Sequence, residues 1–302
     1  MEKNIIQHKL FEKRDLLKLF LPLIGEQLLE LSVGLISSIM VASVGETAVS
    51  GVSLVEFVMA LLISIFAALA TGGAVIAGQY LGNQQEREAR KTCNQLNWFI
   101  GSLGLIIMLL TYVMKNIILQ GLFGEITVEV YNHANTYLMI VALSIPFLAL
   151  YNGGAAIYRT MGNAKLPMKI MLYMNILNVV GNVLLVYVFE FGTSGIAIST
   201  LVSRIGAAAI IILLALNLNN ILYLNKTFRH KFDLGMIRKI LAIGVPFGFE
   251  NGMFHFGRLL VLSLVATFGT PAIAANFCRW HICNFSSSSR YGHRIGGDGY
   301  YF

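Results

Sequence analysis

The sequence predicts an all-α polytopic membrane protein, in which a six-helix lobe is followed by the first helix of a second, parallel-repeat lobe. Three observations predict this fold class: a low content of charged residues, a series of long apolar segments and an internal repeat. Of the 302 residues, 56% are hydrophobic and 12% are charged, and the mean hydropathy is +0.71. Soluble domains carry about 25% charged residues, so half that content indicates a protein of the lipid bilayer.

Seven apolar segments are long enough to be transmembrane helices. They lie at residues 16–44, 49–80, 94–119, 132–161, 167–189, 195–222 and 238–268. Each exceeds the roughly 20 residues that cross a hydrocarbon core, and none shows the period-two alternation of a membrane β-strand. The longer segments must therefore tilt or extend into the headgroup region.

Basic residues gather in alternate connections between these segments. They precede the first segment, follow the second, flank the fourth-to-fifth connection and fill the sixth-to-seventh connection: Lys3, Lys9, Lys13, Arg14, Lys18, Arg87, Arg90, Lys91, Arg159, Lys165, Lys169, Lys226, Arg229, Lys231, Arg238 and Lys239. The opposite connections hold only Lys115. The positive-inside rule therefore places the N-terminus in the cytoplasm. We expect a multi-pass protein of the cell's inner (plasma) membrane.

The seventh segment repeats the pattern of the first at a shift of 224 positions. "LFLPLIGEQ" aligns with "IGVPFGFEN", so that Pro22 matches Pro246 and Glu26 matches Glu250. Six helices separate the two copies, and an even number of crossings gives both copies the same orientation. Internal repeats of this kind occur in secondary transporters, where the substrate path runs between the halves.

The repeat and the loops divide the chain into four parts. Residues 1–222 form the N-terminal six-helix transmembrane lobe, and residues 223–239 form a cytoplasmic linker rich in basic side chains. Residues 240–277 supply the first helix of the C-terminal lobe, and residues 278–302 form a polar tail. We expect the second lobe to be missing from this chain.

Three segments, in this order, resemble the multidrug and toxic compound extrusion (MATE) family. "ALATGGAVIAGQYLGNQQEREA" closes the second apolar segment, "YRTMGNAKLPM" joins the fourth to the fifth, and "FGTSGIAISTLVSR" opens the sixth. The likeness runs from about Leu16 to Phe277. It implies two six-helix lobes forming a secondary active antiporter, which exports small cationic or amphipathic compounds against inward proton or sodium flow. The implied partners are small-molecule substrates and the lipid bilayer. No cofactor is expected; the coupling ion is a proton or sodium.

Other classes of protein are disfavoured. The net charge of +7 does not indicate a nucleic-acid partner, because the basic residues lie between apolar segments and form no patch with interleaved aromatic residues. Cys278, His281 and Cys283 have no fourth partner for a zinc site. We find no phosphate loop and no Ser-His-Asp combination. The sequence therefore predicts neither an enzyme nor a metal-binding protein.

Two glutamates in the first apolar segment are candidate cation-coupling residues. Glu26 and Glu30 are four residues apart, so they share one face of a helix. A carboxylate at bilayer depth costs about 2.5–3.5 kcal/mol on insertion scales, so we expect both to face the bundle. They accept either a coupling proton or sodium ion, or hydrogen bonds from buried structural donors.

Glu250 is the stronger candidate for cation coupling. It follows Pro246, which frees a backbone carbonyl and kinks a helix, and it lies among Gly244, Gly248 and Asn251. Interrupted, glycine-rich helices with carboxylate and amide oxygens are where transporters bind cations. The resemblance also implies a glutamate in the seventh helix as a cation site. Many MATE relatives carry an aspartate at the place of Ser37, so in the first lobe Glu26 or Glu30 would have to substitute for it.

Four asparagines are candidates for the substrate cavity. Asn175, Asn178 and Asn182 form one polar stripe at helical spacing, and Asn251 adjoins Glu250. The stripe predicts either a hydrated cavity wall or hydrogen-bonded contacts between helices. A flippase for lipid-linked saccharides is an alternative function, but it would favour a strongly cationic cavity rather than one rich in Glu and Asn.

The tail departs from the repeat. From Cys278 the sequence reads "CRWHICNFSSSSRYGHRIGGDGYYF", where the repeat calls for another apolar helix. Arginines at this density do not cross hydrocarbon. Codons can be chosen for this peptide that, when read one base forward, encode an uncharged apolar segment. The tail is thus compatible with a shifted reading frame. We therefore expect a one-nucleotide frameshift after about residue 277, rather than a natural polar tail. The alternative to a working exporter is then a non-functional truncated fragment of one.

Overall fold

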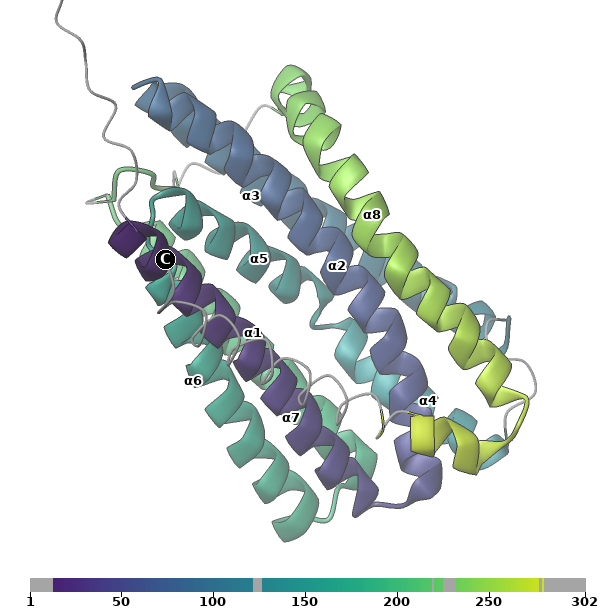
Figure 1. The fold of residues 1–302 in the computed structure, drawn as a ribbon. Helices are drawn as coiled ribbons and strands as arrows, with labels where there is room; N and C mark the ends of the chain where they lie inside the picture. The colour runs from purple at the N-terminus through teal and green to yellow at the C-terminus, as the bar shows by residue number, and fades with distance from the viewer. Residues whose placement is uncertain (1–12, 122–126, 219, 225–231, 277–278, 280–302) are drawn as a thin grey trace, which may run out of the picture.

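The computed structural model describes residues 13–121, 127–218, 220–224, 232–276 and 279, without the side chains of residues 13–20, 251, 254 and 255 (Figure 1). Its named elements are all helices. In chain order they are α1 (Lys13–Ala42), α2 (Glu46–Gly82), α3 (Glu86–Val113), the π-helix η1 (Ile117–Gly121), α4 (Val128–Ala142), α5 (Ile145–Thr160), α6 (Lys165–Asn182), the π-helix η2 (Val183–Val188), α7 (Gly192–Ala215) and α8 (Leu234–Ala266).

Length and composition make five stretches of the described chain able to cross a membrane. These are Leu21–Ala42, Glu46–Gly82, Glu86–Val113, Lys165–Val188 and Gly192–Ala215, and the bent pair α4–α5 makes a sixth if it counts as one span. The six-helix lobe expected from the sequence is therefore confirmed. In α8 only the shorter stretch Phe256–Ala266 is apolar in this sense, so a seventh crossing stays a prediction.

The fourth predicted helix, at residues 132–161, is not continuous. It breaks into α4 and α5, which are bent by 49° relative to each other. Pro146 lies in the first turn of α5; it has no N–H to bond the carbonyl of Ala142, and its ring crowds that carbonyl. The Ser144 hydroxyl donates to the Val141 carbonyl at 2.6 Å, which satisfies one backbone acceptor at the break.

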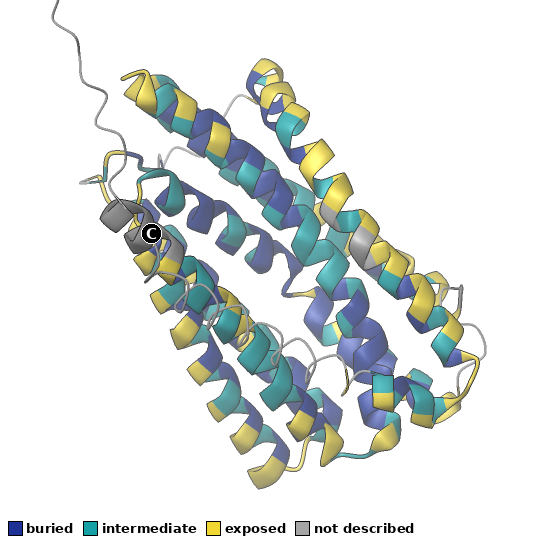
Figure 2. Ribbon diagram, in the orientation of Figure 1, coloured by how far each residue is buried: buried dark blue, intermediate teal, exposed yellow. Residues whose placement is uncertain are grey.

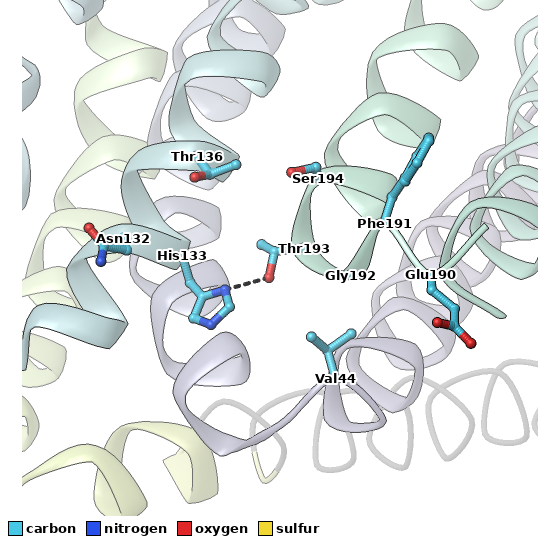
Figure 3. Close-up of a pocket in the computed structure, with 9 residues that line it drawn as sticks. All are labelled: Val44, Asn132, His133, Thr136, Glu190, Phe191, Gly192, Thr193 and Ser194. Carbon is cyan, nitrogen blue, oxygen red and sulfur yellow. Dashed lines mark hydrogen bonds between the residues drawn. The ribbon is translucent and has the colours of Figure 1, made fainter.

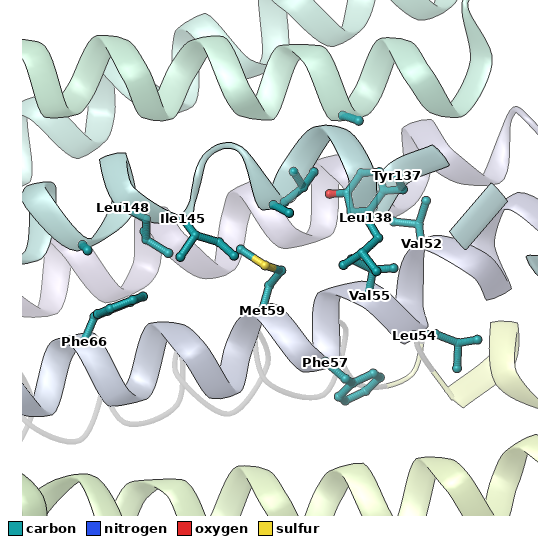
Figure 4. Close-up of a cluster of buried hydrophobic side chains, with 14 of the residues drawn as sticks. Val52, Leu54, Val55, Phe57, Met59, Phe66, Tyr137, Leu138, Ile145 and Leu148 are labelled. Atoms are coloured by element: carbon teal, nitrogen blue, oxygen red, sulfur yellow. The ribbon is translucent and has the colours of Figure 1, made fainter. Parts of the chain in front are cut away.

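Buried apolar side chains fill the space between α2, α4 and α5. Met59, Phe66, Leu138, Ile145 and Leu148 are among the cluster in Figure 4. The outward faces are also apolar. Exposed residues lie on the outer sides of the helices in Figure 2. On α3 they include Leu105, Ile106, Leu109, Leu110 and Val113. Soluble monomers rarely expose an apolar face of this extent, so these side chains match a lipid environment.

α8 packs lengthwise on α2 (Figure 1). A Cβ atom added to Gly72 would lie 2.7 Å from the Gly244 nitrogen and 2.7 Å from the Ile240 oxygen, so the two backbones are almost in contact. Gly248 faces Ala68 one turn further along, where an added Cβ would lie 3.3 Å from the Ala68 Cβ. Small residues four apart on both helices are what allows membrane helices to approach so closely.

The start of α8 is tied to the first lobe by charge. Asp233 accepts a hydrogen bond from the Met236 N–H at 3.2 Å, as an N-cap does. Its carboxylate also lies 2.5 Å from the Lys91 ammonium of α3. The hydrogen bond from Lys91 lowers the pKa of Asp233 below its usual value. The helix thus begins at Leu234, a few residues before the predicted boundary, where this cap satisfies its first turn.

The repeat is visible in the direction of two helices. α1 and α8 run the same way along the bundle (Figure 1), and Pro22 and Pro246 lie inside them. A parallel repeat was expected from the even number of crossings. The arrangement therefore places Glu26 and Glu250 at equivalent positions of two helices with the same direction.

Candidate cation and substrate site

Glu26 is buried in an ion pair that joins α1 to α5. Its side chain is on α1 and 4% of the residue is exposed. Its Oε1 lies 2.6 Å from Nη2 of Arg159 at the end of α5. The Tyr151 hydroxyl lies 3.4 Å from the same oxygen and 3.3 Å from the carbonyl oxygen of Pro167 in α6, so it can donate to either. The glutamate therefore links α1 to α5, and Tyr151 can instead link α5 to the beginning of α6.

The ion pair leaves polar atoms without partners. Glu26 Oε2 and Arg159 Nε are buried and have no hydrogen-bond partner within the described part of the chain. A buried polar atom without a partner costs about 1–3 kcal/mol. The free oxygen is a position where a proton, a cation or a water molecule would be stabilised, so structural pairing and cation binding are both compatible with this geometry.

Glu30 lies one turn further along α1 and is exposed. Its Oε2 accepts a long hydrogen bond from Gln27 Nε2, at 3.4 Å. The described ion pairs do not include it. The two glutamates of the first helix therefore differ, because Glu26 is held by the bundle and Glu30 is accessible.

The asparagine stripe of α6 is buried and hydrogen-bonded to its neighbours. Asn175 donates to the Leu29 carbonyl of α1 at 2.9 Å, and Asn178 donates to the Thr200 hydroxyl of α7 at 3.3 Å. Asn182 donates to Asn178 Oδ1 at 3.1 Å. These amide donors link α6 to both flanking helices. The geometry agrees with the expected interhelical contacts, and a role in the cavity stays a prediction.

Glu250 lies on the exposed side of α8. Pro246 is one turn before it, inside the helix. The neighbouring candidate Asn251 has its backbone in α8, but its side chain lies outside the described residues. The contrast with Glu26 has a physical reason: α5 and α6 pack around Glu26, and the described chain has no counterpart of these helices around Glu250.

A separate pocket lies at one end of the bundle (Figure 3). It has a volume of about 310 Å³ and is lined by Val44, Asn132, His133, Thr136, Glu190, Phe191, Gly192, Thr193 and Ser194. His133 Nδ1 lies 2.7 Å from the Thr193 hydroxyl, so the pocket is bridged between α4 and α7. The pocket contains none of the site residues expected from the sequence. Across the described residues, no group of three metal-ligating side chains occurs.

The sequence analysis missed a polar cluster between α2, α4 and α7. The Tyr137 hydroxyl donates to Glu56 Oε1 in a short hydrogen bond, and Arg204 Nη1 donates to the Ser144 hydroxyl at 2.8 Å. The signal was present, because Glu56 is a carboxylate in the middle of an apolar segment. It carries no neighbouring proline or repeated motif to draw attention to it.

A bundle of long apolar helices, with a parallel repeat and carboxylates inside it, is typical of membrane transport proteins. The MatE family profile matches residues 22–184, which is 163 of the 302 residues. The chain belongs to this family, whose members are transporters rather than enzymes.

Two curated relatives come from Bacillus subtilis (strain 168). The uncharacterized transporter YisQ is 28% identical over 280 residues, covering 90% of this chain and 60% of the relative. The probable multidrug resistance protein YoeA is 26% identical over 268 residues, covering 86% of this chain and 57% of the relative. The chain therefore spans less than two thirds of the length of these relatives.

A solved structure shares the fold. The MATE multidrug transporter DinF-BH aligns with a TM-score of 0.85 at 21% sequence identity. The alignment covers 91% of this chain and 62% of that one. The helices described above are therefore arranged as in a MATE transporter.

Proposed function

We propose that this chain is the first lobe, with the first helix of the second, of a secondary active antiporter for multidrug efflux. The exporter moves small cationic or amphipathic compounds out of the cell, driven by inward flow of protons or sodium ions. One observation carries the proposal: two repeat-related helices of a MatE family chain hold carboxylates at matching positions, Glu26 and Glu250. Ionisable groups within membrane helices mark ion and substrate pathways by default.

Glu250 is the proposed main coupling residue. Its side chain is exposed on α8, one turn after Pro246. The proline removes the hydrogen bond to the Ala242 carbonyl, so a backbone oxygen and a carboxylate are both available to a cation. Glu26, with its free Oε2, and the accessible Glu30 are the coupling candidates of the first lobe.

The proposed substrate cavity adjoins these carboxylates. Asn175, Asn178 and Asn182 come from α6, and Asn251 follows Glu250 on α8. Carboxylate and amide oxygens suit a cationic compound. A lipid-linked saccharide carries phosphate and would need basic groups in the same place, so these side chains support efflux of cations over the flippase alternative.

The proposed orientation places the N-terminus in the cytoplasm, and it can be tested by labelling. Cys278 and Cys283 are first replaced by serine; Cys93 is buried. A single cysteine in place of Glu46, in the first-to-second connection, should react with an impermeant maleimide on intact cells. A cysteine in place of Lys226, in the basic linker, should react only after the membrane is permeabilised. Labelling of position 226 on intact cells would reverse the orientation.

The coupling role of Glu250 is tested in a chain whose reading frame is restored after Phe277. Glu250→Gln keeps the size of the side chain but cannot bind or release a proton or balance a bound cation. It should abolish ion-driven efflux of a fluorescent organic cation from cells while membrane expression is retained. Glu30→Gln should have a smaller effect, and Glu46→Gln, an exposed change at the start of α2, should have none.

The coupling role of Glu250 and the frameshift can each be refuted by a separate result. If Glu250→Gln exports at the parental rate with the same ion dependence, Glu250 is not the coupling residue. The 302-residue chain itself should show no efflux, because alternating access needs two lobes moving about a central site. Sequencing the DNA after the codon of Phe277 shows whether a long apolar frame follows, and its absence would refute the frameshift.

A further inference from the structure

Glu56 is an ionisable group that the proposed coupling set leaves out. It lies ten residues into α2, about 15 Å from the start of that helix. The residue is half-buried, and its neighbours Leu54, Val55 and Phe57 belong to the buried apolar cluster in Figure 4. The ion pairs of the described residues do not include it. Within the described part of the chain, this carboxylate thus lies beside an apolar cluster and forms no salt bridge.

Tyr137 holds this carboxylate from the opposite helix. Tyr137 is on α4, 2% of it is exposed, and its hydroxyl donates to Glu56 Oε1. In Figure 4 its ring lies next to Val52 and Val55 of α2. A hydrogen bond to an ionised carboxylate is roughly twice as strong as one between neutral groups. The contact therefore joins α2 to α4 most strongly while Glu56 is charged.

Basic side chains contact residues of the segments around Glu56. Arg204 on α7 donates to the hydroxyl of Ser144, at the break between α4 and α5. Arg258 on α8 lies over the ring of Phe57, 5.1 Å from its centroid. His133, one turn before Tyr137 on α4, contacts Thr193.

The charged groups of α3 and α5 belong to the other end of the bundle. On α3 they lie between Glu86 and Lys91, in its first turns. On α5 the basic residue is Arg159, which pairs with Glu26 of α1. Because α3 and α5 run so that these ends lie away from the start of α2, their charged groups do not face Glu56. The other acids of α2 and α4, Glu46 and Glu129, lie in the first turns of those helices.

We propose that Glu56 is a proton-binding carboxylate of the first lobe, and that its protonation weakens the Tyr137 contact between α2 and α4. This inference rests on the proposed transport function and adds a residue to it. The step is a simple proton uptake: the carboxylate and one proton give the carboxylic acid. The hydrogen bond from Tyr137 then loses its charge assistance.

The consequence falls on a helix that is already broken. α4 ends at Ala142, and the break is held through Ser144 by Arg204. Loosening the contact of α4 with α2 would therefore act on the bent pair α4–α5. A proton fits the site better than a sodium ion does. The hydroxyl of Tyr137 points its hydrogen at the carboxylate, so it does not add the second oxygen ligand that a metal cation needs.

The test is infrared difference spectroscopy on the 302-residue chain in lipid nanodiscs, between alkaline and acidic pH. A C=O stretching band of a protonated carboxylic acid should appear on acidification and be missing in Glu56→Gln. In Tyr137→Phe the band should remain but change in frequency, because the hydrogen bond to the acid is lost. Glu46→Gln is the matched control on the same helix: it should remove a different band, one that Tyr137→Phe does not shift.

Each result either supports or overturns the proposal. If Glu56→Gln removes no acid band, Glu56 stays ionised and has a structural role. If replacing potassium by sodium suppresses the band at constant pH, the site binds a cation instead of a proton. If Glu56→Gln fails to fold, Tyr137→Phe still tests the proposal, because that variant keeps the acid. An acid band that shifts in frequency supports proton binding at Glu56, and an unshifted band contradicts it. None of these readouts needs transport, so a failure here differs from a failure of the Glu250 experiment.

Discussion

Replacing Arg159 by methionine should destabilise the bundle by about 3 kcal/mol, because Glu26 would be left as a buried charge without its partner. Breaking a buried ion pair by removing one member costs about 3–5 kcal/mol. The side chain of Arg159 is 35% exposed while that of Glu26 is 5% exposed, so we expect the lower end of this range. The free energy of unfolding can be measured by titrating the protein with SDS in mixed micelles.

A second substitution separates the charge effect from lost packing. In the double variant Glu26→Gln with Arg159→Met, no unpaired charge remains, so most of the lost stability should return. Glu26→Gln alone should be milder than Arg159→Met alone, because the arginine left behind is partly exposed. If the double variant is as unstable as Arg159→Met, the contribution of this pair is packing by the long arginine side chain rather than charge.

The helices of the first lobe could be predicted from hydropathy because their apolar content is high over long windows. The break at Ser144 was missed, although Pro146 is plain in the sequence. A single proline inside an apolar segment either kinks a helix or divides it, and the choice depends on what satisfies the freed carbonyls. Here the hydroxyl of Ser144 bonds the adjacent carbonyl of Val141, and Arg204 on a distant segment holds that hydroxyl. Such a contact leaves no local pattern.

The candidate site was predicted unevenly for a similar reason. Glu26 stands out as a charge in an apolar segment, but its partner Arg159 is 133 residues away and looks from the sequence like a cytoplasmic loop residue. The asparagines of α6 show their shared face through helical spacing, whereas their acceptors, Leu29 and Thr200, do not. Periodicity shows which residues share a face; it does not show which helix lies opposite.

The contact between α2 and α8 allows a second test with a large effect. Gly72→Ala places a Cβ atom 2.7 Å from the backbone atoms of Gly244 and Ile240, and backbone cannot move aside as a flexible side chain can. Overpacking costs about 1–3 kcal/mol, which outweighs the gain of up to about 1 kcal/mol from replacing glycine by alanine in a helix. We therefore expect a net loss of stability and a displaced α8. At Gly78 of the same helix the nearest atom, Thr160 Cγ2, is 3.8 Å away from an added Cβ.

Disulfide formation between positions 68 and 248 reports this displacement directly. An ideal Cβ at Gly248 lies 3.3 Å from the Cβ of Ala68, close to the separation of about 3.5–4.5 Å found in disulfides. With Cys278 and Cys283 replaced by serine, the pair Ala68→Cys and Gly248→Cys should cross-link readily under mild oxidation. Adding Gly72→Ala should reduce the yield strongly, whereas adding Gly78→Ala should leave it unchanged and keep or slightly raise the stability. Equal yields in the two variants would mean that α8 does not pack on α2 through these glycines, and the small-residue contact would lose its support.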